Sequence, residues 1–201
     1  MELVCLDLEG VLVPEIWINF AKRTGIKELE ATTRDIPDYD VLMQQLLREH
    51  KLGLPDIQAV IAEMGPLPGA REFLAWVRDN FQLIILSDTF YEFAKPLMEQ
   101  LDLPTLFCHK LEVADDGTIT DYKLRQPDQK TMAIKAFHSL NYRCIAAGDS
   151  YNDTGMLMEA EQGILFDAPE NVIREFPQFP VTHNYEELKA EIRKASLRKI
   201  P

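Results

Sequence analysis

Three short apolar runs each end in polar side chains, and this pattern constrains the fold more than any other feature of the sequence. The first run leads to Asp7 and is followed by Glu9, the second leads to Ser87, and the third leads to Asp149. Open parallel sheets bind ligands just outside the carboxyl ends of their strands. We therefore expect these side chains to meet at one edge of a parallel sheet.

Strand-like and helix-like segments alternate along the chain, which is typical of an α/β fold with a doubly wound, Rossmann-like parallel sheet. Strands are expected at 2–8, 81–86, 142–147 and 163–166, and a hairpin at 106–113 and 118–124. Helices are expected at 14–23, 39–52, 56–64, 70–80, 91–101 and 129–140, from about 152, and after an Asn184 capping box.

Residues 14–68 are mostly helical and fall between the first and second polar strand ends. A stiff Gly-Pro-Leu-Pro-Gly segment at 65–69 marks their boundary. We therefore predict a core domain of residues 1–13 and 69–201, with 14–68 as a small helical cap inserted after the first strand.

Composition excludes several classes of partner. The formal net charge of −12 argues against nucleic acid and anionic membranes. No apolar run approaches the roughly 18–20 residues of a membrane span, and the N-terminus lacks a signal segment, so we expect a cytoplasmic protein. Cys5, Cys108 and Cys144 are odd in number and widely spaced, which indicates reduced, buried thiols. The four histidines show no ligand spacing.

Four motifs, in order along residues 7–153, resemble those of the haloacid dehalogenase-like superfamily of phosphohydrolases. Asp7 to Val11 resembles its first motif, Asp-x-Asp-x-Thr/Val, and Ser87 its second. Lys130 resembles its isolated lysine, and the segment Gly148 to Asp153 its Gly-Asp-x-x-x-Asp. Each motif alone is weak, but their joint order and spacing are specific.

Within this superfamily the sequence is similar to the phosphoserine phosphatase branch, in particular to a variant that also transfers phosphate to homoserine. Residues 7–15, 87–93 and 168–177 carry that similarity. The resemblance implies phosphoserine as substrate, homoserine as a phosphate acceptor and Mg²⁺ as cofactor.

Asp7 and Glu9, at the first acidic strand end, are expected to have two different catalytic roles. Asp7 would attack the phosphoryl group and form an aspartyl phosphate, and a divalent cation would neutralise the charges that meet. Asp7, Asp149 and the backbone carbonyl of Glu9 offer the oxygen ligands that Mg²⁺ prefers. Glu9 stands where the superfamily has the aspartate that acts as general acid and base. The alternatives are solvated loop acids and a Glu9 side chain that only packs.

The remaining candidates bind phosphate or substrate. Ser87, with the amide of Asp88, and Lys130 would hold phosphoryl oxygens. Asn152 is expected to contact substrate or phosphate. Asp153 could orient Lys130 or cap the next helix, and we do not expect it to ligate the metal.

Specificity is expected from the cap. Glu15 matches the acid that recognises the substrate amine in this branch, although acids are also common in a first helical turn. The branch also expects an arginine for the substrate carboxylate. Arg48 is the nearest candidate, and a solvated surface role is its alternative.

Two other functions fit part of the pattern. The first is a phosphatase of the same chemistry for another small phosphomonoester. The second is a non-enzymatic phosphoacceptor module of the response-regulator receiver type, which lacks a helical insertion like residues 14–68. The hairpin at 106–124 has an open edge that could pair two chains into a homodimer.

Overall fold

The computed structural model describes residues 1–25 and 53–200. The expected helix at 39–52 and Arg48 therefore lie outside the described residues.

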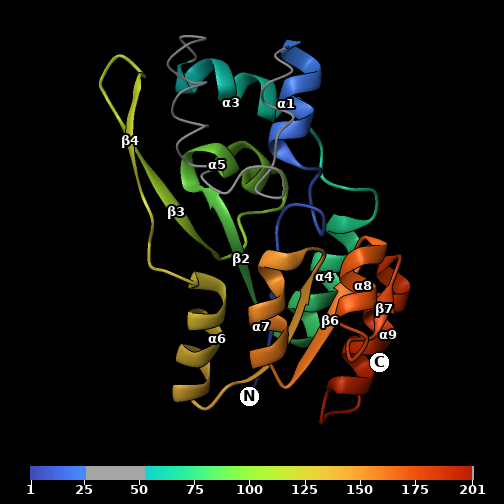
Figure 1. Cartoon of the computed structure of the whole chain (residues 1–201). Coiled ribbons are helices and arrows are strands. Elements are labelled where there is room, and N and C mark those ends of the chain that lie inside the picture. The colour runs from blue at the N-terminus through green and yellow to red at the C-terminus, as the bar shows by residue number, and fades with distance from the viewer. Residues whose placement is uncertain (26–52, 201) are drawn as a thin grey trace.

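Strands of the described chain form one seven-stranded sheet in the order β4-β3-β2-β1-β5-β6-β7 (Figure 1). All neighbours are parallel except β3 and β4, which form the expected antiparallel hairpin. The strands are β1 (Glu2–Leu6), β2 (Gln82–Phe90), β3 (Leu106–Val113), β4 (Ile119–Lys123), β5 (Arg143–Gly148), β6 (Gln162–Phe166) and β7 (Val181–Thr182).

Helices cover both faces of this sheet, as in a doubly wound fold. Val4 and Leu6 of β1 pack in one core with α4, α5 and α9, whereas Leu3 and Cys5 pack in a second core with α6, α7 and α8. This alternation follows from the period of two along a strand. The helices are α1 (Ile16–Thr24), α3 (Leu54–Ala62), α4 (Ala70–Asn80), α5 (Tyr91–Gln100), α6 (Gln129–Ser139), α7 (Thr154–Glu159), α8 (Glu170–Glu175) and α9 (Tyr185–Ala195). The predicted fold class is confirmed.

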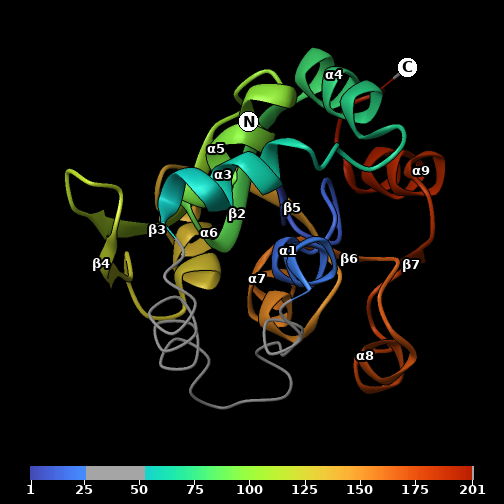
Figure 2. The ribbon, with the colours of Figure 1, turned by 90° about the horizontal axis from the view of Figure 1, so that it is seen from above.

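Helices α1 and α3 lie beyond the carboxyl ends of the strands (Figures 1 and 2). They contact each other, and α3 also packs on α5. Helix α1 begins at Ile16, two residues later than expected, so Pro14 lies outside its first turn. It is followed by Gly25, whose φ of 75° closes the helix in the left-handed region, as expected from the sequence.

Some boundaries differ from the expectation. Strand β2 continues through Ser87 to Phe90, with an irregular register against β3 after Leu86, where we expected the strand to end. A 3₁₀ turn (Tyr151–Asp153) precedes α7. Helix α8 and strand β7 were not expected from the sequence, because elements of six and two residues carry too little periodicity.

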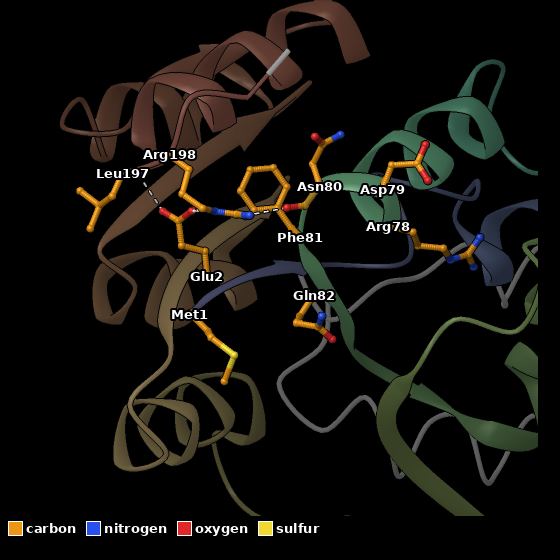
Figure 3. A pocket seen from close by; sticks show the side chains of 9 residues that line it. All are labelled: Met1, Glu2, Arg78, Asp79, Asn80, Phe81, Gln82, Leu197 and Arg198. Atoms are coloured by element: carbon orange, nitrogen blue, oxygen red, sulfur yellow. Dashed lines mark hydrogen bonds and ion pairs between the residues drawn. The ribbon is translucent and has the colours of Figure 1, made fainter.

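A hollow of about 480 Å³ lies at the amino ends of β1 and β2, away from the polar strand ends. Figure 3 shows Glu2 and Arg198 meeting on its wall. Glu2 accepts hydrogen bonds from the Arg198 Nε at 2.9 Å and the Leu197 amide at 2.8 Å, which tie the C-terminal segment to β1. Within the described residues, no helix has both the length and the apolar character needed to span a membrane.

Candidate active site

Asp7 lies directly after β1, at the centre of the sheet's carboxyl edge. Its amide donates to the Ala147 carbonyl of β5 at 3.0 Å, which continues the ladder one residue past the strand. Strands β2 and β5 flank β1 in parallel, so Ser87 and Asp149 emerge on either side of Asp7. The order of the strands therefore brings the polar strand ends together, as predicted.

A tight turn after Asp7 leaves room for Asp149. Gly10 has a φ of 76°, and a Cβ added there would lie 2.4 Å from Asp149 Oδ2. Glycine is therefore required twice, for the left-handed backbone and for the close approach of the carboxylate.

Lys130 lies in the interior of the site, with only 2% of its surface exposed. It belongs to the first turn of α6, and its Nζ lies 3.0 Å from Asp7 Oδ1 and 2.7 Å from Asp153 Oδ1. Burial alone would lower the pKa of Lys130, but Asp153, Asp7 and Asp88 outweigh it and raise that pKa. The lysine therefore stays charged and links three strand ends.

Asp153 binds the ammonium group of Lys130 and fixes its position. Its Oδ2 accepts the amides of Asp149 and Ser150 at 3.0 and 3.1 Å, while its Oδ1 contacts Lys130. A Cβ on Gly148 would lie 2.4 Å from Asp153 Cγ, so the glycine is needed for this approach. Asp153 thus orients Lys130, as one of the two expectations had it. It does not cap the next helix, because its side chain makes no cap hydrogen bond to α7 and instead closes a capping box with Ser150 in the 3₁₀ turn that precedes α7.

The charges of this cluster do not balance without a further cation. Asp7, Asp149 and Asp153 bring ligand atoms within 4.8 Å of one another, and Lys130 is the cation that the described residues place among them. Burial raises the pKa of Asp7, and the charges of Asp153 and Asp149 add to the rise, with Lys130 opposing it. Three carboxylates with one ammonium leave two negative charges, and the hard oxygen donors fit a divalent ion such as Mg²⁺.

Glu9 reaches back to the start of α1. Its Oε2 accepts the amide of Ile16 at 2.8 Å, one of the amides that a helix leaves unpaired. Burial, followed by the nearby charge of Glu15, raises the pKa of Glu9 to about 8, although the Ile16 amide, Lys130 and Thr89 lower it. The side chain therefore tends to hold a proton at neutral pH.

A polar network joins β2 to the other strand ends. Gln129 donates to the Ser87 carbonyl and, at 3.0 Å, to Asp88 Oδ1. Asn152 donates to Asp88 Oδ2 at 2.9 Å, and His109 lies 3.8 Å from Asp88 Oδ1. Burial would raise the pKa of Asp88, but Lys130 and these partners keep it low. Asp88 therefore acts as an ionised link among β2, β3, α6 and the turn after β5.

The structure thus brings together Asp7, Glu9, Ser87, Asp88, Lys130, Asn152 and Asp149. Glu15 lies close enough to Glu9 for its charge to act on that group, at the N-cap of α1. Sequence reasoning missed Gln129 and His109. Gln129 adjoins Lys130 in the chain, which was the available signal, whereas nothing local distinguishes His109.

Comparisons with known proteins identify the family to which this chain belongs. A family model of haloacid dehalogenase-like hydrolases matches residues 1–161. The chain belongs to that hydrolase family. The predicted superfamily is therefore confirmed, and the receiver-type alternative is set aside.

Relatives cover the full chain. It is 66% identical to phosphoserine phosphatase ThrH of Pseudomonas aeruginosa, over 100% of this chain and 99% of the relative. It is 63% identical to a phosphoserine phosphatase of Pseudomonas syringae pv. tomato, over 100% of this chain and 86% of the relative. A crystal structure of a phosphoserine phosphatase in apo form, 20% identical, superposes with a TM-score of 0.75 over 96% of this chain and 98% of that chain. That structural likeness shows the shared fold.

Proposed function

We propose that this hydrolase is a magnesium-dependent phosphoserine phosphatase that acts through an aspartyl phosphate on Asp7. The observation that carries the proposal is the buried Asp7 carboxylate beside Lys130 and Asp149 at the central strand end. The names of the two Pseudomonas relatives support the substrate.

Asp7, Asp149 and the backbone carbonyl of Glu9 would hold Mg²⁺. Asp153 is committed to Lys130 and to two backbone amides, so we assign it no place among the ligands. The ion supplies positive charge that lets an anionic nucleophile approach a phosphate dianion.

The first step is attack by Asp7 on phosphorus, with cleavage of the bond to the ester oxygen. Asp7 Oδ1 already accepts the Leu8 amide at 2.8 Å and faces Lys130 at 3.0 Å. We therefore assign the attack to Oδ2. Lys130 and the Ser87 hydroxyl, with the amide of Asp88, would bind the phosphoryl oxygens and stabilise their charge.

Glu9 would act as the general acid in the first step and as the general base in the second. In its acid form it donates a proton to the departing seryl oxygen, and the resulting carboxylate then takes a proton from the water that attacks the aspartyl phosphate. This second attack returns Asp7 as a carboxylate and releases phosphate. The pKa of about 8 supports the donor role at neutral pH.

Phosphotransfer to homoserine is the finer part of the proposal. Glu9 is one methylene longer than the usual aspartate, and its Oε2 is bound to the start of α1. This contact would aim the proton acceptor toward the α1 side of the site, where an alcohol bound near the cap could replace water. Homoserine would then accept the phosphoryl group.

Substrate binding is assigned to the cap, residues 14–68. Glu15, beside Glu9, would bind the substrate amine, and Asn152 would lie near the phosphate. Arg48 remains our candidate for the carboxylate. A hydrolase of another small phosphomonoester is the competing assignment. A homodimer through the β4 edge and a cytoplasmic location also remain proposals.

Phosphorus NMR of the full chain with Mg²⁺ and O-phospho-L-serine tests these assignments, with and without L-homoserine and with a chelator control. Inorganic phosphate is expected in the first tube, with phosphohomoserine added in the second. Absence of chelator-sensitive phosphoserine loss would refute the substrate, and phosphate as the only product in both tubes would refute the transfer.

A further inference from the structure

A second cluster of metal-ligating side chains lies on the opposite end of the sheet from Asp7. His138 lies in the last turn of α6, Cys144 near the start of β5, and Glu161 just before β6. Each offers a ligand atom, and these atoms lie within 4.8 Å of one another. Figure 1 shows α6 and α7 side by side, and they also contact each other.

The three groups already contact one another. Glu161 Oε2 accepts the Cys144 amide at 2.7 Å and lies 3.1 Å from His138 Nε2. Cys144 is fully buried, whereas 28% of the His138 side chain and 39% of the Glu161 side chain are exposed. An ion could therefore enter between the exposed pair and reach the thiol beneath them.

The surrounding residues orient these ligands as partners of metal sites do. Glu159 Oε1 lies 3.6 Å from the other imidazole nitrogen, Nδ1. This separation is longer than a hydrogen bond. A carboxylate that closes on the far nitrogen of a histidine when a metal binds would fix the ring and direct Nε2 to the metal. Cys5, on the adjacent strand β1, is buried in the same apolar cluster as Cys144.

We propose that His138, Cys144 and Glu161 form a Zn²⁺ site, with water as the fourth ligand. One imidazole, one thiolate and one carboxylate match the nitrogen, sulfur and oxygen donors of tetrahedral zinc. Thiolate and imidazole ligands select Zn²⁺ over Mg²⁺. Mg²⁺ instead favours the all-oxygen cluster at Asp7. Binding would release the Cys144 proton to solvent and replace the His138–Glu161 hydrogen bond by two bonds to the ion.

This site is separate from the catalytic one. Cys144 and Gly148 are four residues apart on β5, which places the two sites about 13 Å apart along the strand. Zinc would join the end of α6 to β5 and to the start of β6. We therefore expect it to raise the melting temperature without contacting substrate.

Cobalt substitution tests the proposal on the full chain with saturating Mg²⁺. Co²⁺ bound to a thiolate gives a sulfur-to-metal charge-transfer absorption, which Co²⁺ in the acidic cluster cannot give. We expect this band in the native chain, saturating at one equivalent and displaced by Zn²⁺. Absence of the band in the native protein would overturn the proposal.

Variants locate the ligands. His138→Ala and Glu161→Gln alter partly exposed side chains and should keep the fold, while weakening Zn²⁺ binding by more than about 100-fold. Glu159→Gln should weaken it by about 10- to 100-fold. His183→Ala, which removes an exposed histidine paired with Asp167 at 3.5 Å, is the matched control and should bind normally. Native affinity in both His138→Ala and Glu161→Gln would refute the site, even if Cys144→Ser failed to fold.

Discussion

Replacement of Asp153 by asparagine should destabilise the protein, because this buried carboxylate is shared between Lys130 and two backbone amides. Its two oxygens face different donors: Oδ1 meets Lys130 at 2.7 Å, and Oδ2 meets the amides of Asp149 and Ser150 at 3.0 and 3.1 Å. An asparagine has one oxygen and one NH₂ group. In either orientation the NH₂ group faces another donor, so one buried partner loses its acceptor.

The magnitude follows from the burial of the pair. Removing one partner of a buried ion pair costs about 3–5 kcal/mol. Lys130 keeps Asp7 at 3.0 Å, so we expect the lower end, about 3 kcal/mol. For a chain of this size each kcal/mol lowers the melting temperature by about 2–4 °C, which predicts a drop of about 6–12 °C.

Differential scanning calorimetry in Mg²⁺ measures this drop, with Glu112→Gln as a control that removes the same charge from an exposed pair with Lys123. The control should melt as the native protein does. An Asp153→Asn melting temperature within about 2 °C of native, about the shift from 1 kcal/mol, would refute the structural reasoning.

Three further predictions concern the turn after β1 and the metal ligands. Gly10→Ala should lower the free energy of unfolding, measured in urea, by at least about 1 kcal/mol and should remove most of the turnover. The φ of 76° at this position disfavours a side chain, and the added Cβ would meet Asp149. Native stability and native turnover in this variant would contradict the prediction. Glu9→Asp should retract the carboxylate from the Ile16 amide and shift product partition toward hydrolysis, measured by phosphorus NMR; an unchanged ratio would sink that reasoning. Chelation of Mg²⁺ should abolish turnover and restored Mg²⁺ should recover it, whereas Asp149→Asn should need much more Mg²⁺ for half-maximal rate; an unchanged requirement would exclude Asp149 as a ligand.

The positions of the polar strand ends could be predicted from the sequence because their signals are local. An apolar run that ends in Asp7 or Asp149 identifies both the strand and the polar edge, and parallel pairing then brings the two together. The capping role expected at Asn184 is likewise local: its side chain accepts the Glu187 amide at 3.0 Å.

The remaining features depend on long-range packing. The Glu9 contact with Ile16 depends on where α1 begins, which the sequence placed two residues early at Pro14. The link from Gln129 to Ser87 joins residues 42 positions apart. Local sequence patterns do not predict such contacts, because they arise from the order of the strands in the sheet.

Phosphoenzyme trapping tests the central claim most directly. The protein is mixed with Mg²⁺ and phosphoserine carrying labelled phosphate, quenched in acid within milliseconds, and mapped by peptide mass spectrometry. The account predicts a hydroxylamine-sensitive acyl phosphate on Asp7, absent from Asp7→Asn together with turnover. Label on another residue, or full activity in Asp7→Asn, would contradict it.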